Sequence, residues 1–591
     1  MASEPAGPTT RVTALGVVVA LLFAILVGRL WQLQVVQGEH YLAESEENRL
    51  RDLRLPAPRG TLYDRKGRPL VTSRAAFTVS ILPNEIRSAE RVLPRLAAIL
   101  QLPEGEIRDR IARARSRPFE PVRLRRDVSK AIVAMVEENR LDLPGVIIEV
   151  EPVRHYLYGS LAAHALGYLG EINPAELAST AWTDYRMGDL VGKGGVERVY
   201  DRVLRGYEGR QRVEVDARGR LLRVLGREPA RAGRSIVLTI DLDIQRAAEA
   251  ALGTRTGAVV VLDPRNGEIL ALASHPAYDP NAFAAGISAR RWARLSGDRT
   301  LPLLNRAAEG AYEPGSVFKI VTAAAALTRG TATRATRIHC PGVFRLGGWI
   351  FHDLRAHGTV DFVTGVAQSC NVFFWTLGYR TGGEAMSQMA HALGLGERTG
   401  VDLPSESPGL IPSAAWKQRT LGEPWYPGDN INMAIGQGWV NTTPLQIARM
   451  AAAVGNGGTL VRPHLVREII DPETRQSERV RVAPLGSIHM GAEALATLRD
   501  GLEAVVLRGT GRRVALPGLA IAGKTGSAEN PRGKPHAWFT AYAPAEAPRV
   551  ALAVLVEHGW RGSVAAGPIA KAILATAFGI ATEPQTQGAA P

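Results

Sequence analysis

Residues 258–273 read Ala-Val-Val-Val-Leu-Asp-Pro-Arg-Asn-Gly-Glu-Ile-Leu-Ala-Leu-Ala, with an apolar run on each side of a polar turn. The runs cover 258–262 and 268–273, and the turn between them contains an Asn-Gly pair. Asn-Gly between two apolar runs is a strong β-hairpin signal, because both residues tolerate the positive φ angles of a tight turn. The stretch therefore predicts two paired antiparallel strands.

Further strands and helices are predicted on both sides of this hairpin. Residues 537–543 alternate polar and apolar side chains, and 550–556 form a continuous apolar run typical of a buried strand. An alanine-rich helical pattern begins at Asp241, and the last helical pattern ends near Phe578. We expect residues 241–580 to form an α/β (α+β) domain with a mainly antiparallel sheet flanked by helices, followed by a disordered tail at 581–591.

A serine and a lysine follow the helix breaker Pro314-Gly315, one helical turn apart. The pattern after the breaker places Ser316 at a helix N-terminus and Lys319 on the same face. A serine hydroxyl is a weak nucleophile that needs a nearby base, and a buried lysine loses its proton more easily than a free one. Ser-x-x-Lys alone is weak support for a catalytic site, because chance matches are common.

Two more polar clusters lie downstream, each next to an apolar segment: Ser369-Cys370-Asn371 and Lys524-Thr525-Gly526-Ser527. The first precedes an apolar helix-like run, and the second follows the apolar stretch 519–522. All three clusters fall within the predicted α/β domain. Together and in this order, they strongly favour a serine-nucleophile acyl-transfer site.

The third cluster also fits a nucleotide-binding pattern. Residues 518–525, Gly-Leu-Ala-Ile-Ala-Gly-Lys-Thr, match the phosphate-loop pattern G-x-x-x-x-G-K-[ST], which makes a nucleotide hydrolase the rival function. That site needs a flexible loop after a strand and a helix after Lys-Thr. Here the inner residues suit a strand, and Gly-Ser-Ala-Glu-Asn-Pro-Arg-Gly after Lys-Thr breaks helices. The sequence favours the acyl-transfer interpretation.

Composition indicates a globular protein. The 591 residues are 46% hydrophobic and 22% charged, which excludes a disordered or collagen-like chain. The formal net charge of +14 can favour nucleic acid, anionic lipid or an anionic polymer. The sequence carries no RNA-binding signature, zinc-finger spacing or basic-helix heptads, so we expect no nucleic-acid partner.

The N-terminal segment predicts a single membrane anchor. Seventeen uncharged residues, 12–28, lie between Arg11 and Arg29, and apolar residues continue beyond Arg29. We expect a spanning helix at 12–35 after a cytoplasmic tail at 1–11, with the large remainder outside. A cleaved signal peptide is the alternative, but no convincing small-x-small cleavage site follows the apolar stretch.

Residues 36–240 are dense in arginine and glutamate with short apolar runs. Residues 59–67 suggest a strand and a turn, and the glycine-rich 192–197 suggests a turn into a helix at 196–204. No nucleophile lies beside a base in this region. We therefore expect an elongated pedestal or dimerisation-type domain.

The three motifs in this order are those of penicillin-binding proteins and class A β-lactamases. The chain resembles a class B penicillin-binding protein over nearly its whole length, and the pedestal matches include Arg59-Gly60, Asp64-Arg65 and 194–197. The resemblance implies a β-lactamase-like serine transpeptidase domain on a pedestal. It also implies an inner-membrane peptidoglycan D,D-transpeptidase with serine-type D-Ala-D-Ala carboxypeptidase chemistry, inhibited by β-lactams, with its catalytic domain in the periplasm.

The family's roles transfer residue by residue. Ser316 would attack the penultimate D-Ala carbonyl of a stem peptide with Lys319 as base. Ser369 and Asn371 would relay protons and hold the substrate amide, and Lys524 and Thr525 would bind the terminal carboxylate. Gly526 and Ser527 would complete the substrate-binding residues, and the N–H groups of Ser316 and Ser527 would form the oxyanion hole. An amine of a neighbouring strand would then resolve the acyl-enzyme. This chemistry requires no cofactor.

Within the class, residues 425–429 (Trp-Tyr-Pro-Gly-Asp) and 434–438 (Ala-Ile-Gly-Gln-Gly) are similar to penicillin-binding protein 2 of rod elongation. This resemblance implies a role in cell shape and an integral-membrane glycan polymerase of the elongation complex as partner. A septal (divisome) paralogue, a contact activator of the polymerase with little catalysis, and a β-lactamase or β-lactam sensor remain alternatives.

Four residues form a candidate metal set: Cys340, Asp353, His357 and Cys370. Asp353 and His357 are four apart, hence on one face if helical. Two thiolates, an imidazole and a carboxylate would suit tetrahedral zinc. A Cys340–Cys370 disulfide and two unrelated buried thiols are the alternatives. The resemblance favours structural zinc, because some elongation members hold it with an Asp, Asp, His, Cys set, in which Cys340 replaces the first Asp.

Overall fold

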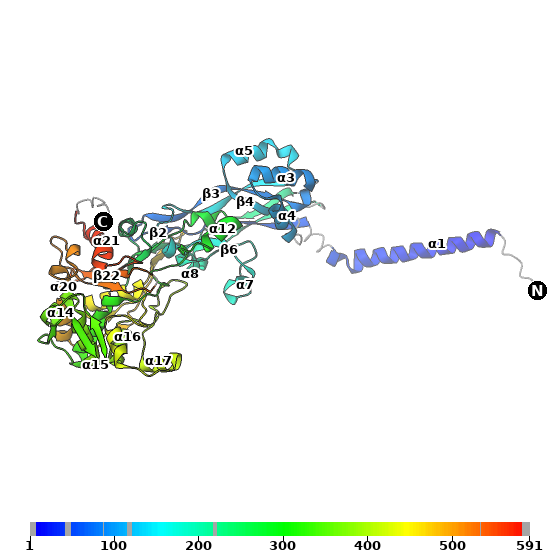
Figure 1. The fold of residues 1–591 in the computed structure, drawn as a ribbon. Coiled ribbons are helices and arrows are strands. Elements are labelled where there is room, and N and C mark those ends of the chain that lie inside the picture. Colours follow the sequence, from blue (N-terminus) through cyan, green and yellow to red (C-terminus); the bar gives the residue numbers. More distant parts are fainter. Residues whose placement is uncertain are drawn as a thin grey trace, which may run out of the picture. The chain divides into compact units, whose positions relative to one another are not determined.

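The computed structural model describes residues 8–41, 49–86, 88–114, 121–216, 221–531 and 533–581, whose elements are drawn in Figure 1. The chain forms two compact units. The first unit comprises residues 1–58, 75–152 and 207–231, and the second comprises 59–74, 153–206 and 232–591. Two segments of the expected pedestal, 59–74 and 153–206, therefore share a unit with the three motifs.

A five-stranded antiparallel sheet forms the centre of the second unit, in the order β12-β11-β23-β22-β21. Its strands are β11 (Gly257–Leu262), β12 (Ile269–His275), β21 (Ala522–Ala528), β22 (His536–Ala543) and β23 (Val550–Val556). The hairpin predicted from residues 258–273 is confirmed, with Val260 opposite Leu272. The α/β fold with a mainly antiparallel sheet is confirmed as well.

Both faces of this sheet are buried. Successive side chains of a strand point to opposite faces, so Val259 and Val261 of β11 enter one apolar cluster while Val260 and Leu262 enter another. Helices α10 (Leu242–Leu252) and α21 (Gly562–Phe578) contribute to the first cluster. This two-sided burial explains why β11 and β23 are apolar along their whole length.

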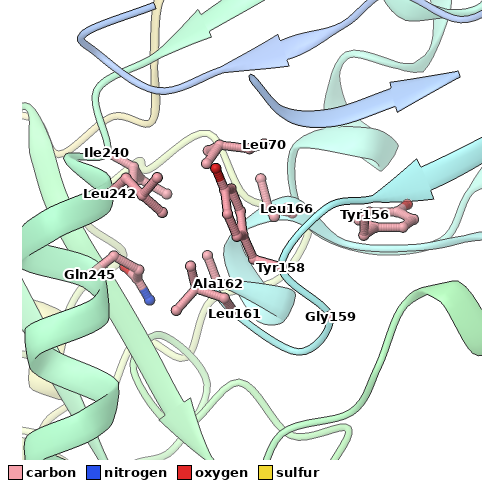
Figure 2. Close-up of a pocket in the computed structure, with 10 residues that line it drawn as sticks. All are labelled: Leu70, Tyr156, Tyr158, Gly159, Leu161, Ala162, Leu166, Ile240, Leu242 and Gln245. Atoms are coloured by element: carbon pink, nitrogen blue, oxygen red, sulfur yellow. The ribbon is translucent and has the colours of Figure 1, made fainter. Parts of the chain in front are cut away.

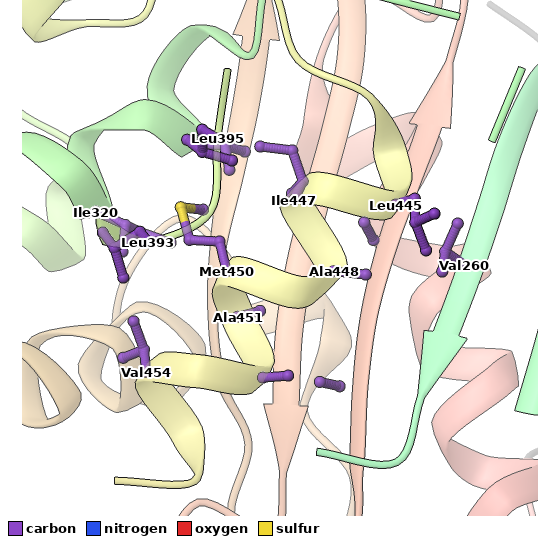
Figure 3. Close-up of a cluster of buried hydrophobic side chains, with 14 of the residues drawn as sticks. Val260, Ile320, Leu393, Leu395, Leu445, Ile447, Ala448, Met450, Ala451 and Val454 are labelled. Atoms are coloured by element: carbon purple, nitrogen blue, oxygen red, sulfur yellow. The ribbon is translucent and has the colours of Figure 1, made fainter. Parts of the chain in front are cut away.

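Helix α19 (Pro444–Gly455) covers the opposite face. All of its residues are buried, which fits a helix that is apolar on nearly every side. Figure 3 shows Leu445 beside Val260 of β11, while Ile447, Met450 and Val454 extend the same cluster. The helix therefore joins the sheet to the helical region that holds two of the motifs.

That helical region surrounds α13 (Lys319–Arg329), which follows the 3-10 turn η5 (Gly315–Phe318). Helix α13 packs against α15 (Asn371–Thr381), and α14 (Phe362–Gln368) packs against α20 (Ala492–Leu507). The other helices of this unit with at least seven residues are α12 (Ala289–Ser296), α16 (Gly383–Ala392), α17 (Ala414–Leu421) and α18 (Pro427–Ala434). Two small sheets pair β13 (Arg337–Cys340) with β16 (Gly358–Asp361) and β14 (Val343–Leu346) with β15 (Trp349–His352).

The second unit also contains β2 (Leu62–Tyr63), the start of β3 (Pro69–Ile81), β10 (Ser235–Leu238), β18 (Val466–Ile470) and β19 (Ser477–Arg479). Strands β6 (Leu169–Glu171) and β7 (Leu190–Gly192) form a separate pair. The expected continuous helix at 196–204 is wrong: it breaks at Tyr200 into α8 (Gly195–Val199) and α9 (Asp201–Leu204). At the break, the Tyr200 hydroxyl donates to Asp402 at 3.0 Å, a tertiary contact that no local pattern reveals.

The first unit contains a three-stranded sheet and a small α/β region. The sheet has the order β1 (Leu50–Leu55), β8 (Gly209–Val215), β9 (Leu221–Glu228). In the α/β region, the end of β3 pairs with β4 (Val122–Val128), and α3 (Ala89–Leu100), α4 (Glu104–Arg113) and α5 (Lys130–Glu138) share one apolar cluster. Strand β5 (Val146–Tyr156) also pairs with β3.

Helix α1 (Pro8–Trp31) and the π-helical turn η1 (Gln32–Val36) lie at the N-terminal end. Together they give a segment of 25 residues, Val12–Val36, with a mean hydropathy of 2.4 in its most apolar window. It is long and apolar enough to cross a membrane, as the sequence predicts. The expected tail at 1–11 and the C-terminal tail at 581–591 fall mostly outside the described residues.

Candidate active site

Ser316 lies in the turn η5, half-buried, one turn before Lys319. Lys319 is the first residue of helix α13, which follows this turn directly, and the shared face of the two side chains stays a prediction. Gly315 before it has a φ of +52°, and a Cβ there would lie 2.5 Å from the Ser527 carbonyl oxygen. Only glycine therefore lets the serine turn pack against strand β21.

Lys319 is buried and hydrogen-bonds to the second motif. Its Nζ donates to Asn371 Oδ1 at 2.6 Å, to the Ser369 carbonyl at 2.9 Å and to Ser369 Oγ at 3.2 Å. Burial lowers the pKa of Lys319 to about 8, although the nearby Asp353 and Cys370 oppose this shift. A lysine with this pKa is partly neutral near pH 8 and can accept a proton.

Ser369 ends helix α14 in the left-handed region, with a φ of +56°. This conformation costs free energy for a residue with a Cβ, so the surrounding contacts must hold it. It directs the Ser369 hydroxyl to two lysines, because Lys524 Nζ also donates to Ser369 Oγ, at 2.8 Å. The structure thus brings the second and third motifs together on one hydroxyl.

The third motif lies inside strand β21, not after it. The strand begins at Ala522 and includes Lys524, Thr525, Gly526 and Ser527, so the strand expected at 519–522 is displaced toward the C-terminus. Pairing with β22, where Lys524 is opposite Thr540, holds these small and polar residues extended. A phosphate loop requires Lys-Thr at the start of a helix, so this strand removes the support for the nucleotide-hydrolase alternative.

Burial shapes the charges of the third motif as well. It lowers the pKa of Lys524 well below its usual value, and the charge on Lys319 acts in the same direction.

Gly526 is required by packing, because a Cβ there would lie 2.9 Å from Val317 Cγ2 and 3.0 Å from the Pro314 carbonyl oxygen. Strand β21 therefore lies directly against the turn that holds Ser316.

Two residues beside these motifs have no signal in the sequence. Thr510 Oγ1 lies 2.7 Å from Thr525 Oγ1, although the two are 15 residues apart on different elements. Glu313 is half-buried three residues before Ser316, and burial, then the charge of Glu529, raises the pKa of Glu313 to about 7. No spacing rule in the sequence predicts that Thr510 lies beside Thr525 or that Glu313 lies near Glu529. Both depend on how separate segments pack.

The candidate metal residues lie together. The four possible ligand atoms of Cys340, Asp353, His357 and Cys370 all lie within 4.8 Å of one another. Cys340 Sγ is 3.6 Å from Asp353 Oδ2 and 3.4 Å from His357 Nδ1, and the last two atoms are 3.5 Å apart. Both cysteines are free, so the disulfide alternative is not what the structure contains.

Asp353 and His357 do not lie on a helix, which corrects one expectation from the sequence. They occupy the loop between β15 and β16, where Asp353 N donates to the Gly342 carbonyl and His357 N donates to the Cys340 carbonyl. The loop, rather than a helical period of four, therefore brings the two side chains together.

A small apolar cavity lies elsewhere in the second unit and contains no motif residue. Figure 2 shows Tyr158 beside Leu70, Ile240 and Leu242, with Gln245 at the edge. The Gln245 side chain is already hydrogen-bonded to Glu249 and to both backbone groups of Leu272. The cavity has no free polar group on Gln245 to hold a ligand, and it does not extend the site.

Comparison with known proteins places this geometry in a family. The family model described as Penicillin binding protein transpeptidase domain matches residues 257–575, and the Penicillin-binding Protein dimerisation domain matches 54–238. The chain belongs to the penicillin-binding protein transpeptidase family. The first model covers all three motifs, and the second covers most of the expected pedestal.

Curated relatives of the chain belong to the subfamily that the sequence resembles. The chain is 36% identical to Peptidoglycan D,D-transpeptidase MrdA of Acinetobacter baumannii over 577 residues, covering 94% of this chain and 85% of that protein. It is 34% identical to the protein of the same name from Escherichia coli K12, covering 94% and 92%. The resemblance to the elongation subfamily is therefore confirmed.

Solved structures of PBP2 proteins and of a peptidoglycan synthase complex are also similar to this chain over most of its length. PBP2 of Helicobacter pylori, in a complex with MreC, matches with a TM-score of 0.76 and 28% identity, covering 90% of this chain and 99% of that one. Pseudomonas aeruginosa PBP2 in complex with WCK 5153 matches with a TM-score of 0.67 and 28% identity, covering 89% and 96%. A chain of a peptidoglycan synthase complex matches with a TM-score of 0.69 and 33% identity, covering 98% and 100%.

Proposed function

We propose that this chain is a peptidoglycan D,D-transpeptidase that crosslinks stem peptides during cell elongation through a serine acyl-enzyme. One observation carries the proposal: the Ser369 hydroxyl is hydrogen-bonded to two buried lysines from two other motifs, next to the turn that holds Ser316. Membership of the family and its MrdA relatives support the same reaction. Inhibition by β-lactams follows, because these compounds mimic D-Ala-D-Ala.

In the first half-reaction, Ser316 Oγ bonds to the carbonyl carbon of the penultimate D-Ala. Lys319 takes the serine proton in its neutral form, which is accessible because burial lowers its pKa to about 8. The peptide bond to the terminal D-Ala then breaks, and the leaving amine receives a proton through the Ser369 hydroxyl. Asn371 holds Lys319 in place and is positioned to bind the substrate amide.

Strand β21 binds the rest of the substrate. Lys524 and Thr525 bind the terminal carboxylate, and Gly526 leaves room for the strand to lie against the serine turn. The N–H groups of Ser316 and Ser527 stabilise the oxyanion, since they come from the two elements that meet at Gly315. In the second half-reaction, an amine of a neighbouring stem peptide attacks the acyl carbon and releases Ser316.

The cluster of Cys340, Asp353, His357 and Cys370 fits a structural zinc ion. Bonds of about 2.0–2.3 Å in a tetrahedron separate ligand atoms by about 3.3–3.8 Å, and three of the separations here are 3.4–3.6 Å. When bound, zinc would supply a fixed tetrahedral link and no chemistry of the reaction. Cys370 lies between Ser369 and Asn371 of the second motif, at the start of helix α15. As a zinc ligand it would connect this helix start to the β15–β16 loop.

The same proposal places the chain in the bacterial inner membrane, with one span near residues 12–36 and the catalytic unit in the periplasm. An integral-membrane glycan polymerase and other elongation-complex proteins are the partners, and the H. pylori relative forms a complex with MreC. We assign residues 241–580 to the transpeptidase domain and 36–240 to the pedestal, of which 59–74 and 153–206 belong to the same compact unit as the three motifs.

The test is covalent labelling of the full chain in detergent with a fluorescent penicillin. We expect stable labelling of the wild type and none in Ser316→Ala. Ser288→Ala is the matched control, because Ser288 also precedes a helix in this unit but caps α12. Labelling that decays within seconds would indicate a β-lactamase, and a folded wild type without label would contradict the proposal and favour a contact activator.

A further inference from the structure

Thr510 is held between the second and third motifs. It follows helix α20, and its hydroxyl lies 2.7 Å from that of Thr525 on strand β21. Its backbone N–H donates to the Ala367 carbonyl at 3.1 Å, two residues before Ser369. The residue therefore contacts the strand that carries Lys524 and the helix end that carries Ser369.

The backbone around Thr510 has little freedom to move away from these contacts. A Cβ on Gly509 would lie 2.2 Å from the Ala367 carbonyl oxygen, so this backbone approach is possible only with glycine. On the other side, Gly511 N donates to the Val505 carbonyl at 2.9 Å. The Thr510 hydroxyl is thus presented to Thr525 from a fixed position.

A hydroxyl has one proton to donate and can also accept hydrogen bonds. If Thr525 donates its proton to a substrate carboxylate, the bond with Thr510 can persist only with Thr510 as the donor. The resulting chain runs from the Thr510 hydroxyl to Thr525 Oγ1 and from the Thr525 hydroxyl to the carboxylate. Consecutive hydrogen bonds of this kind polarise and strengthen one another.

We propose that Thr510 is a positioning residue for anionic substrates, directing the Thr525 hydroxyl proton toward the terminal carboxylate. This inference rests on the proposed function, in which Thr525 binds that carboxylate. Without Thr510, the Thr525 proton is free to rotate to other acceptors, and part of the carboxylate affinity is lost. Loss of one such bond corresponds to about a fivefold to tenfold weaker binding.

The experiment measures acylation of the full chain in detergent by a penicillin with a free carboxylate and by its methyl ester. Rates measured across penicillin concentration separate the dissociation constant K of the non-covalent complex from the acylation rate constant k2. For Thr510→Val we expect K for the acid to rise about fivefold to tenfold. The acylation rate constant k2 for the acid, and both constants for the ester, should be nearly unchanged. Thr510→Ser keeps the hydroxyl and should restore the acid to within about twofold of wild type.

Matched variants separate this role from general damage. Thr331→Val breaks another threonine pair of this unit, Thr331 with Thr381 at 2.8 Å, and should leave both ligands unchanged. Thr525→Val should weaken binding of the acid as Thr510→Val does. The double variant should bind the acid only slightly more weakly than either single variant, because both changes remove the same chain of hydrogen bonds.

Three results would overturn the inference. An equal loss for acid and ester in Thr510→Val, or no recovery in Thr510→Ser, would mean that Thr510 only supports the fold. Wild-type behaviour of Thr510→Val, together with loss of the acid in Thr525→Val, would remove Thr510 alone and leave the proposed function standing. Full acid binding in Thr525→Val would remove the proposed carboxylate site, and this inference with it.

Discussion

Two buried lysines share one hydroxyl at the centre of this site. Lys319 and Lys524 both donate to Ser369 Oγ, and burial lowers the pKa of each. Two ammonium groups so close together are costly in a buried site, so the loss of one proton relieves both desolvation and repulsion. At the scale of single residues, the chemistry follows from this arrangement of charge.

Acylation by penicillin should therefore depend on pH through Lys319. Its pKa is lowered to about 8, and the neutral form is the base, so the rate rises as pH increases through this value. We expect about a tenfold rise per pH unit from pH 6 to 7 and a plateau above about pH 9. Stopped-flow acylation of the wild type between pH 6 and 9.5 measures this profile.

Lys319→Arg supplies the comparison, because arginine keeps the positive charge but does not lose its proton in a protein. It should lower the acylation rate by at least about a hundredfold at every pH. Lys66→Arg, at a half-exposed ion pair with Asp241 and Asp243, should retain the wild-type profile. A wild-type rate that stays flat across this pH range would remove Lys319 as the titrating base.

Among the elements, the β15–β16 loop and the start of helix α15 meet at the proposed zinc ligands. Asp353 also accepts a hydrogen bond from Val372 N at 3.2 Å, and Cys370 caps α15 by accepting from Phe373 N at 3.3 Å. The loop supplies Asp353 and His357 to this cluster, and the second motif supplies Cys370. A metal ion bound by the cluster would therefore fix the loop and the motif relative to each other.

Zinc removal should consequently loosen this part of the catalytic unit. We expect about one zinc ion per chain by elemental analysis, and a fall in melting temperature of about 2–3 °C after chelation, equivalent to about 2 kcal/mol. Cys340→Ser should lower the zinc content and the melting temperature together. A metal-free wild type whose stability does not respond to added zinc would instead support two buried free thiols.

At the scale of the whole molecule, a buried charge network joins distant segments of the second unit. Glu197 accepts from Arg154 at 2.6 Å and from Arg59 at 2.8 Å, and Arg59 also donates to Asp201 at 2.9 Å. The side chains of Arg154, Glu197 and Asp201 are almost completely buried. The two positive and two negative charges balance, as a buried network requires.

Removing one charge should therefore destabilise the whole unit. Glu197→Gln leaves two buried guanidinium groups facing a single carboxylate, and we expect the free energy of unfolding to fall by about 3–5 kcal/mol. Urea denaturation followed by tryptophan fluorescence measures the change. The matched control is Glu384→Gln on the exposed side of α16, which should cost less than about 0.5 kcal/mol. Equal stability of both variants would show that the network contributes little.

The sequence by itself determined the features that neighbouring residues encode. The Asn-Gly hairpin at 258–273, the apolar strand at 550–556, the membrane-length helix and the three ordered motifs all depend on short-range patterns of turns, periodicity and spacing. The family followed from the same motifs, because their order along the chain carries the resemblance.

Only the tertiary structure decided which separate segments meet. It broke the 196–204 helix at Tyr200, moved the third motif into a strand by pairing it with β22, and placed Asp353 and His357 on a loop. It also brought Thr510 to Thr525 and placed residues 59–74 and 153–206 in the catalytic unit. Such contacts depend on packing between elements far apart in sequence, where no local pattern of residues specifies the partner.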